Sequence, residues 1–142
     1  MSFVHGKDAV FSLDDSGGTL RAIKIYLNSI TGLPGARALS EVTAFGDAGT
    51  KSIPGLANVP FSIGGHYDAT ASTGVATVLN GLRTATSTAT FEYGPAGGST
   101  GALKITGECW MTELTYDASV SDRVPVAASF QVDGIPTLTT YA

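Results

Sequence analysis

The chain has 142 residues, of which 43% are hydrophobic and only 14% are charged, and its formal net charge is −4. This length suits a single domain, residues 1–142, with one core that needs no disulfide staples. The acidic balance argues against specific nucleic-acid binding, which needs clustered lysines and arginines, and no segment approaches the ~20 apolar residues of a membrane span.

The first residues, Met1 to Lys7, lack the regions of a secretory signal, so the chain is expected to be made and kept inside a cell. The sole cysteine, Cys109, cannot form an internal disulfide and is predicted to be a small buried hydrophobe. The two histidines, His5 and His66, lie far apart in the sequence and offer no metal-ligand spacing. We therefore expect no cofactor and no metal.

Two strands are predicted near the start of the chain. Residues 9–13 form a short strand that ends at Asp14 and Asp15, which precede a turn rich in serine and glycine. Residues 19–27 mix polar and apolar positions, and their isoleucines and tyrosine favour a second strand.

A long connection follows at residues 31–58. Connections longer than ~12–15 residues are uncommon in compact domains and are usually functional or disordered. A disordered linker rarely carries as many apolar residues as this stretch does, namely Leu39, Val42, Phe45, Ile53 and Leu56. Two interpretations stay open: a loop that orders against another subunit, or a loop that folds back on its own core.

The next predicted strand, residues 58–68, alternates between apolar and polar side chains. Its apolar face carries Val59, Phe61, Ile63 and Tyr67. On the other face, His66 and Asp68 could form a base with an orienting carboxylate. No nucleophile accompanies them, so an exposed polar face is the simpler interpretation.

Residues 72–83 form the one predicted helix, with Ser72 or Thr73 as its candidate cap. Its apolar positions follow the 3.6-residue period and lie on one stripe: Val75, Val78, Leu79 and Leu82. The rest of the chain is predicted to be β, at residues 88–93, 102–117, 123–133 and 137–141. The glycine-rich turn 94–101 lacks the ending of a phosphate-binding loop.

Two details of the second half bear on packing. The apolar parity of the strand 102–117 shifts near residues 111–114, which indicates a β-bulge or two apolar faces. Strand 123–133 alternates cleanly, with Val124, Val126, Ala128, Phe130 and Val132 predicted to point inward. The predicted fold is mainly β: two packed antiparallel sheets, as a β-sandwich or partly open barrel, with one flanking α-helix at about 72–83 and a long loop at about 35–57.

Several runs resemble one family. Phe11 to Arg21, Tyr26 to Gly35, Leu39 to Asp47 and Lys51 to Leu56 are similar to segments of the tail tube (major tail) proteins of phages with long non-contractile tails. The similarity covers about residues 8–133. It implies a structural protein rather than an enzyme, located in the virion tail and assembled in the cytoplasm of the host bacterium.

The resemblance also implies partners. Copies of the chain would close into hexameric rings that stack into a tube, and DNA would pass through the lumen without specific binding. Other tail proteins would be a tape measure protein, the tail tip or distal tail protein, and a tail terminator. The long loop would contact a neighbouring subunit or ring.

Two sets of residues are candidate sites under this resemblance. The expected subunit interface carries Leu39, Val42, Phe45, Asp47, Lys51, Ile53 and Leu56. The expected acidic residues of the lumen are Glu92, Glu108, Glu113 and Asp117. For each of these four, an ordinary surface charge is the alternative interpretation.

Other functions stay open at this point. A related ring-forming protein, such as a tail terminator, a contractile-tail component or a secretion-tube component, fits the same features, and so does a capsid decoration protein. A small enzyme would have to use His66, Asp68 or the Asp14–Asp15 pair. The turn that follows Asp14 and Asp15 explains that pair better.

Overall fold

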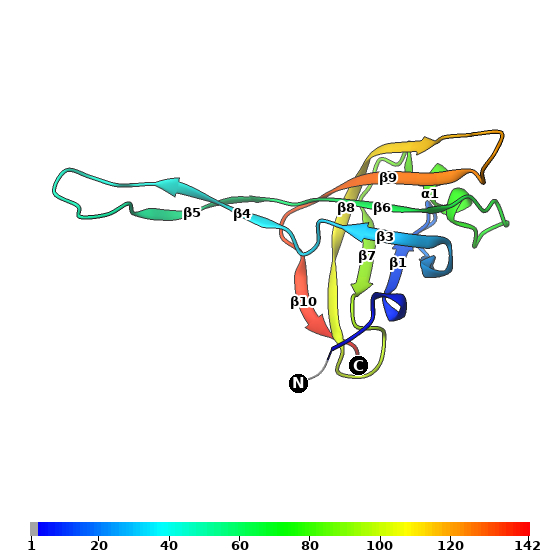
Figure 1. Cartoon of the computed structure of the whole chain (residues 1–142), viewed down its shortest axis with the longest axis horizontal. Coiled ribbons are helices and arrows are strands. Elements are labelled where there is room, and N and C mark those ends of the chain that lie inside the picture. Colours follow the sequence, from blue (N-terminus) through cyan, green and yellow to red (C-terminus); the bar gives the residue numbers. More distant parts are fainter. Residues whose placement is uncertain (1–2) are drawn as a thin grey trace.

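The computed structural model describes residues 3–142, and in this range it has ten strands, one α-helix and two short 3-10 helices. Eight strands form the main sheet, in the order β2-β1-β7-β8-β9-β6-β3 with β10 also paired to β8, and β4 and β5 form a separate two-stranded sheet (Figure 1). The elements are η1 (Gly6–Asp8), β1 (Val10–Asp14), β2 (Leu20–Ala22), η2 (Lys24–Tyr26), β3 (Leu27–Thr31), β4 (Ala36–Glu41), β5 (Ser52–Asn58), β6 (Pro60–His66), α1 (Val75–Leu82), β7 (Ala89–Gly94), β8 (Leu103–Tyr116), β9 (Pro125–Val132) and β10 (Thr137–Thr140).

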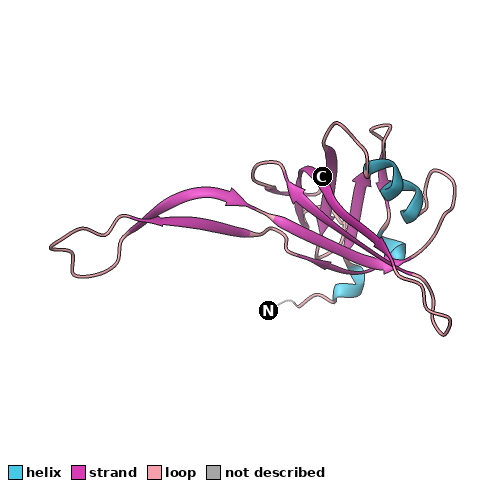
Figure 2. Cartoon of the chain, turned by 90° about the horizontal axis from the view of Figure 1, so that it is seen from above, coloured by secondary structure: helices cyan, strands magenta, loops and turns pink. Residues whose placement is uncertain are grey.

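Every strand pair in the described chain is antiparallel, which confirms the expectation of a mainly β protein with antiparallel sheets and one helix. The main sheet ends at β2 and β3, so it does not close into a barrel. The two-stranded sheet projects far to one side of the body (Figure 2).

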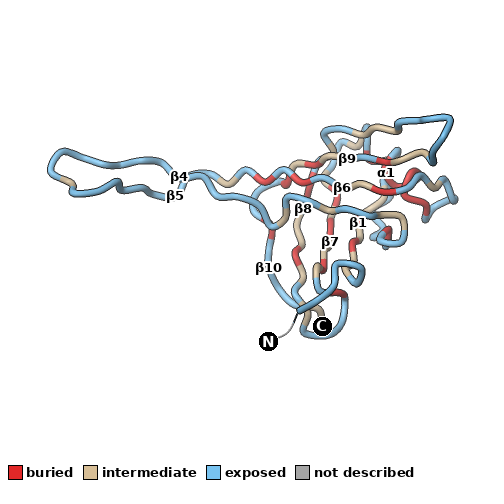
Figure 3. Tube along the Cα trace, viewed as in Figure 1, coloured by how far each residue is buried: buried red, intermediate tan, exposed pale blue. Residues whose placement is uncertain are grey.

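The core lies between two parts of the main sheet that face each other. The ring centroids of Phe11 in β1 and Phe61 in β6 lie 6.2 Å apart, although three strands separate β1 from β6 in the sheet order. The ring of Phe91 in β7 lies 5.0 Å from that of Phe61. The sheet therefore bends over on itself, and its strands carry the buried segments that Figure 3 shows in red.

The helix α1 lies within the predicted range and buries the predicted stripe of Val75, Val78, Leu79 and Leu82. The predicted cap is wrong. Gly74 is the N-cap residue, and neither Ser72 nor Thr73 caps the helix with its side chain. A Cβ on Gly74 would lie 2.6 Å from the carbonyl oxygen of Asp68, so the close approach of this loop requires glycine at the cap position.

The predicted parity shift in β8 is a β-bulge. The register with β9 shifts between Met111 and Glu113, which leaves Thr112 as the extra residue. Cys109 therefore faces the core before the bulge, and Leu114 packs against the core after it. In β9, the alternation predicted from the sequence is confirmed by the burial of Val126, Ala128, Phe130 and Val132.

Residues 19–27 do not form one strand. The chain pairs with β1 as β2, turns through η2, and only then begins β3, which pairs with β6 at the other end of the sheet order. Ile23 is fully buried at this corner, and its N–H donates to the carbonyl of Phe11 at 3.1 Å. Burial of one isoleucine on the corner overrides the strand propensity of its neighbours.

Candidate assembly surface

Residues 36–58, here called the arm, connect β3 to β6, and they form a two-stranded ribbon rather than an irregular loop. Two glycines with positive φ, Gly32 at 104° and Gly35 at 102°, lie at the base of the arm. A Cβ on Gly32 would collide with the carbonyl of Pro60, and one on Gly35 would collide with Val59. Glycine therefore lets the chain leave β3 while it stays tight against β6.

The register of the arm distributes its apolar side chains over both faces. Leu39 pairs with Pro54, and the next pair is Ser40 with Ile53. Because successive side chains of a strand point to opposite faces, Leu39 and Ile53 lie on opposite faces of the ribbon. A two-stranded ribbon with apolar residues on both faces cannot bury both against a single body.

The tip of the arm is held by hydrogen bonds. The Asp47 carboxylate accepts the Ala44 N–H at 2.7 Å and forms an ion pair with Lys51 Nζ at 2.9 Å. The Ala44 N–H and then the Lys51 ammonium lower the pKa of the Asp47 carboxyl. The Lys51 N–H donates to Thr43 Oγ1 at 2.9 Å. Of the predicted interface residues, the structure thus brings Asp47 and Lys51 together in the turn itself.

The other five predicted interface residues are exposed apolar side chains of the arm: Leu39, Val42, Phe45, Ile53 and Leu56. Phe45 is fully exposed at 109% and Leu56 is 91% exposed. Almost the whole arm is exposed in Figure 3. The arm therefore does not fold back on its own core, which was one of the two interpretations. Apolar area of this kind stabilises a structure only when another surface covers it, at ~25 cal/mol per Å².

The four acidic residues expected in the lumen lie on or beyond β7 and β8. Glu92 lies 3.6 Å from Lys104 Nζ, and Glu108 accepts hydrogen bonds from Thr88 and Thr90. Glu92 pairs with Thr106, which shares its face of β8 with Glu108, so both carboxylates lie on the face away from the core.

The other two acidic candidates are exposed. Glu113 follows the bulge and pairs with Ser129, between core-facing Met111 and Leu114. It therefore also points away from the core. Asp117 comes directly after the end of β8. The bulge thus keeps Glu113 on the same outer face of β8 as Glu108, and Glu92 lies on that face in the neighbouring strand β7.

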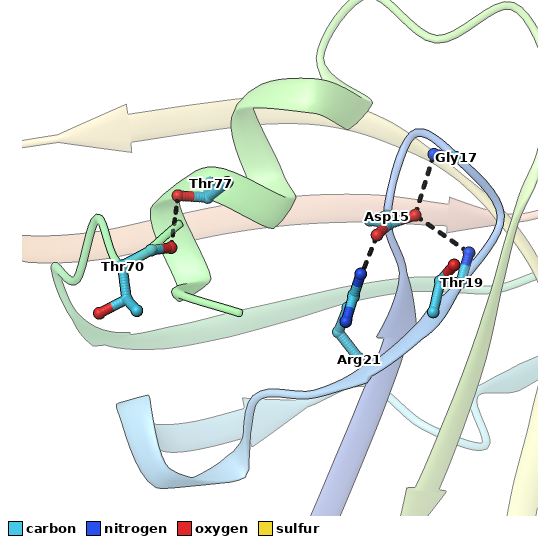
Figure 4. Close-up of polar contacts among 6 residues, drawn as sticks. All are labelled: Asp15, Gly17, Thr19, Arg21, Thr70 and Thr77. Carbon is cyan, nitrogen blue, oxygen red and sulfur yellow. Dashed lines mark hydrogen bonds and ion pairs between the residues drawn. The ribbon is translucent and has the colours of Figure 1, made fainter. Parts of the chain in front are cut away.

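The Asp14–Asp15 pair serves the fold. The Asp15 carboxylate accepts N–H groups from Gly17 and Thr19 and pairs with Arg21 Nε at 3.0 Å (Figure 4). The Thr19 N–H and then Arg21 lower the pKa of Asp15. Asp14 accepts the Thr90 N–H at 3.3 Å from the neighbouring strand. The Asp15 carboxylate thus stabilises the turn, and the Asp14 carboxylate links β1 to the neighbouring strand β7.

The residues near His66 belong to the loop that leads into α1. Asp68 accepts the Thr70 N–H at 2.8 Å, and hydrogen bonds from Thr70 lower the pKa of its carboxyl. The carbonyl of Thr70 in turn accepts from Thr77 Oγ1 at 2.9 Å (Figure 4). His66 is exposed at the end of β6. Asp68 therefore orders this loop through the hydrogen bond that its carboxylate accepts from Thr70.

Within residues 3–142, no group of three or more His, Cys, Asp or Glu side chains is placed to hold a metal ion. No helix in the same range is both long enough and apolar enough to cross a membrane.

An open groove of about 730 Å³ lies on the body, and no pattern in the sequence predicts it. Its walls include Val4, Lys7, Lys24, Ile25 and Tyr93, which come from three separate parts of the chain. Ile25 is 73% exposed in η2, within the stretch that the sequence predicted to be a strand. No local pattern marks such a groove, because only the tertiary fold brings its walls together.

Comparison with known proteins finds no matching family model and no matching curated sequence. Solved structures do match, at low sequence identity. A chain from the tail of an empty GTA particle, refined helically with C6 symmetry, is 17% identical with a TM-score of 0.73, over 99% of this chain and 100% of that one. A chain of the SPP1 tail tube is 14% identical with a TM-score of 0.70, over 97% of this chain and 80% of that one.

A third similar structure is the anti-feeding prophage cap, described as a tube-terminating cap. It is 11% identical with a TM-score of 0.67, over 99% of this chain and 93% of that one. The three likenesses extend over nearly the whole chain, the arm included. They show that the chain has the fold found in these tail and tube structures, as the resemblance of its sequence implied.

Proposed function

We propose that this chain is a structural subunit of a tail tube and that its copies self-assemble through the arm. The observation that carries the proposal is the arm itself, which exposes five large apolar side chains beside a body that has a well-buried core. Exposed apolar surface of this extent is typical of an interaction site. The fold shared with the GTA tail and the SPP1 tail tube supports the same role.

The proposed assembly is a stack of hexameric rings with an open lumen. The C6 symmetry of the similar GTA tail supports six subunits in each ring. Ring closure would also cover the free edges of β2 and β3, which otherwise invite aggregation. In this assembly Leu39, Phe45 and Leu56 would anchor the arm on a neighbouring subunit, and Asp47 and Lys51 would shape its tip.

The proposed lumen carries negative charge. Six copies at −4 each give −24 per ring. If Glu92, Glu108, Glu113 and Asp117 face inward, they would repel DNA phosphates within the ~8 Å Debye length at physiological salt. A conduit for DNA ejection works best when its wall does not hold the DNA. The tube would lie in the virion tail, assemble in the host cytoplasm, and meet tape measure, tail tip and terminator proteins.

A second candidate function is that of a subunit of a related ring, which either terminates a tail tube or belongs to another kind of tube. The similarity of the fold to that of the anti-feeding prophage cap supports this candidate. A terminator would stop at one ring, whereas a tube subunit would add ring upon ring. A component of a contractile tail or secretion tube would also propagate, and a capsid decoration protein would bind a shell instead.

Sedimentation velocity over a concentration series tests the proposal. The wild-type chain is expected to form species much larger than a monomer as concentration rises. A variant with Leu39→Ser, Phe45→Ser and Leu56→Ser is expected to stay monomeric with an unchanged circular dichroism spectrum, because these side chains are exposed in the single chain. Equal assembly of both proteins would contradict the role of the arm.

A further inference from the structure

The groove on the body has apolar walls and a basic rim. Val4, Ile25, Leu27 and Ile30 supply apolar surface, and Lys7 and Lys24 supply two of the eight basic side chains of the chain. Among residues 3–142, no acidic residue lines the groove. Neither lysine forms an ion pair with any residue in the described range 3–142. The groove thus offers unpaired positive charge beside exposed apolar side chains.

The groove lies along β3, and the arm follows the end of the same strand. The first four residues of β3, Leu27 to Ile30, line the groove, and the strand ends at Thr31, just before the arm. In Figure 1, β3 runs from the corner at η2 toward the side from which the arm projects. A copy shifted along this direction would therefore present its η2 corner and groove to the arm of the copy behind it.

The arm has a length and a chemistry that match this groove. Each limb has about ten residues, which span roughly 30 Å at ~3.3 Å per residue. The arm is therefore long enough to reach past its own body to another. Val42 and Phe45 are exposed near its tip, and Glu41 is an exposed carboxylate with no ion pair among the described residues. Apolar contact and charge complementarity thus point to the same pairing.

We propose that the groove lined by Ile25, Leu27, Lys7 and Lys24 receives the arm of a second copy of this chain. This inference rests on the proposed function and names the surface that the arm binds. The contact is head-to-tail, since arm and groove are different patches of one chain. A repeated head-to-tail contact that does not close produces an open filament, which is the geometry of a stacked tube.

A charge-swap experiment tests the pairing by the concentration at which assembly begins. Glu41→Lys alone, and Lys7→Glu with Lys24→Glu, are each expected to raise that concentration by at least about tenfold. The triple variant is expected to return to within about threefold of wild type, because the reversed charges again attract. Arg83→Glu, an exposed reversal at the end of α1, is the matched control and should leave assembly unchanged.

Cross-linking supplies a second readout. Ala44→Cys in the arm of one preparation and Ser29→Cys in the groove of another are expected to give a disulfide-linked dimer when the two are mixed and oxidised. Thr84→Cys, which is exposed after α1, replaces Ser29→Cys as the control and should give none. The native Cys109 is buried and does not interfere.

The outcomes separate this inference from the proposed function. Large assemblies that form equally well with every charge variant, without the specific cross-link, overturn the arm-in-groove contact and leave the tube subunit standing. Loss of assembly in both reversals without rescue in the triple variant also overturns the pairing of Glu41 with this groove. A wild-type chain that never assembles overturns the proposed function, and the inference falls with it.

Discussion

Phe61 and Phe130 are cross-strand partners on β6 and β9, and their rings stack with centroids 5.0 Å apart and an angle of 14° between planes. Phe61 also contacts Phe91 of β7, which lies on the facing part of the sheet. The stacked pair therefore joins the two facing parts of the main sheet. These aromatic contacts stabilise the bend of the sheet and the start of β6, where the arm joins the body.

Phe130→Ala is expected to lower the free energy of unfolding by about 3–5 kcal/mol, because it opens a cavity where Phe130 is now 1% exposed. Urea denaturation of the monomer measures this change. The matched control is Ser129→Ala on the other face of β9, where the Ser129 hydroxyl bonds, among residues 3–142, only to the Ser62 hydroxyl at 3.3 Å. This control should lower the free energy of unfolding by no more than about 1 kcal/mol. Equal midpoints for both variants would mean that β9 faces the other way.

Phe45→Ala is expected to weaken association while it leaves the unfolding of the monomer unchanged. The reason is that Phe45 is fully exposed in the single chain, whereas an aromatic anchor in an interface contributes about 2 kcal/mol or more. Sedimentation velocity measures the first effect and thermal denaturation at low concentration measures the second. A large drop in the melting temperature of the monomer would place Phe45 in a core and refute the exposed arm.

The turn at the arm tip is expected to loosen in acid. The pKa of Asp47 is lower in the folded chain than the usual value of about 3.9, so the ionised carboxylate stabilises the turn. That stabilisation is complete above the unfolded pKa and is lost as pH falls through the lower folded pKa. Hydrogen exchange of the Ala44 amide, followed from pH 6 to pH 2, measures it.

Asp47→Asn is the control for this experiment, because it removes the titrating group and keeps the shape of the side chain. The Ala44 amide of this variant should show no step near the carboxyl titration beyond the ordinary pH dependence of exchange. A wild-type step centred above pH 4 would show that the turn does not favour the ionised carboxylate, and it would contradict the geometry of the tip.

Cys109 is expected to resist thiol reagents in the folded chain. Burial, with smaller contributions from Glu108 and Asp14, raises the pKa of its thiol to about 12, so the reactive thiolate is nearly absent at pH 8. Mass spectrometry after treatment with iodoacetamide should find labelling in urea but almost none in buffer. Similar labelling in both conditions would place Cys109 on the surface.

The sequence predicted the elements that have one face buried in the core. The alternation through Val126, Ala128 and Phe130 marks the buried face of β9, and the stripe from Val75 to Leu82 marks the buried face of α1. The parity shift that indicates the bulge near Thr112 was visible for the same reason. Hydrophobic periodicity describes a segment well when one of its faces is buried in the same chain.

The arm lacks that signal. All residues of β4 and nearly all of β5 are exposed, so no buried face imposes an alternation on them. The sequence therefore marked the stretch as apolar and unusual without predicting a hairpin. The groove could not be predicted from the sequence for another reason. Val4, Ile25 and Tyr93 meet only through the tertiary fold, and the corner that exposes Ile25 depends on the burial of Ile23.

Electron microscopy of the purified chain across a concentration series, with mass measured alongside, tests the central claim most directly. The account predicts rings or tubes with an open centre, in which the arm of each subunit lies on a neighbouring copy and a reconstruction identifies the side chains that face the lumen. A chain that stays monomeric at high concentration, with residues 36–58 packed on its own core, would contradict the account.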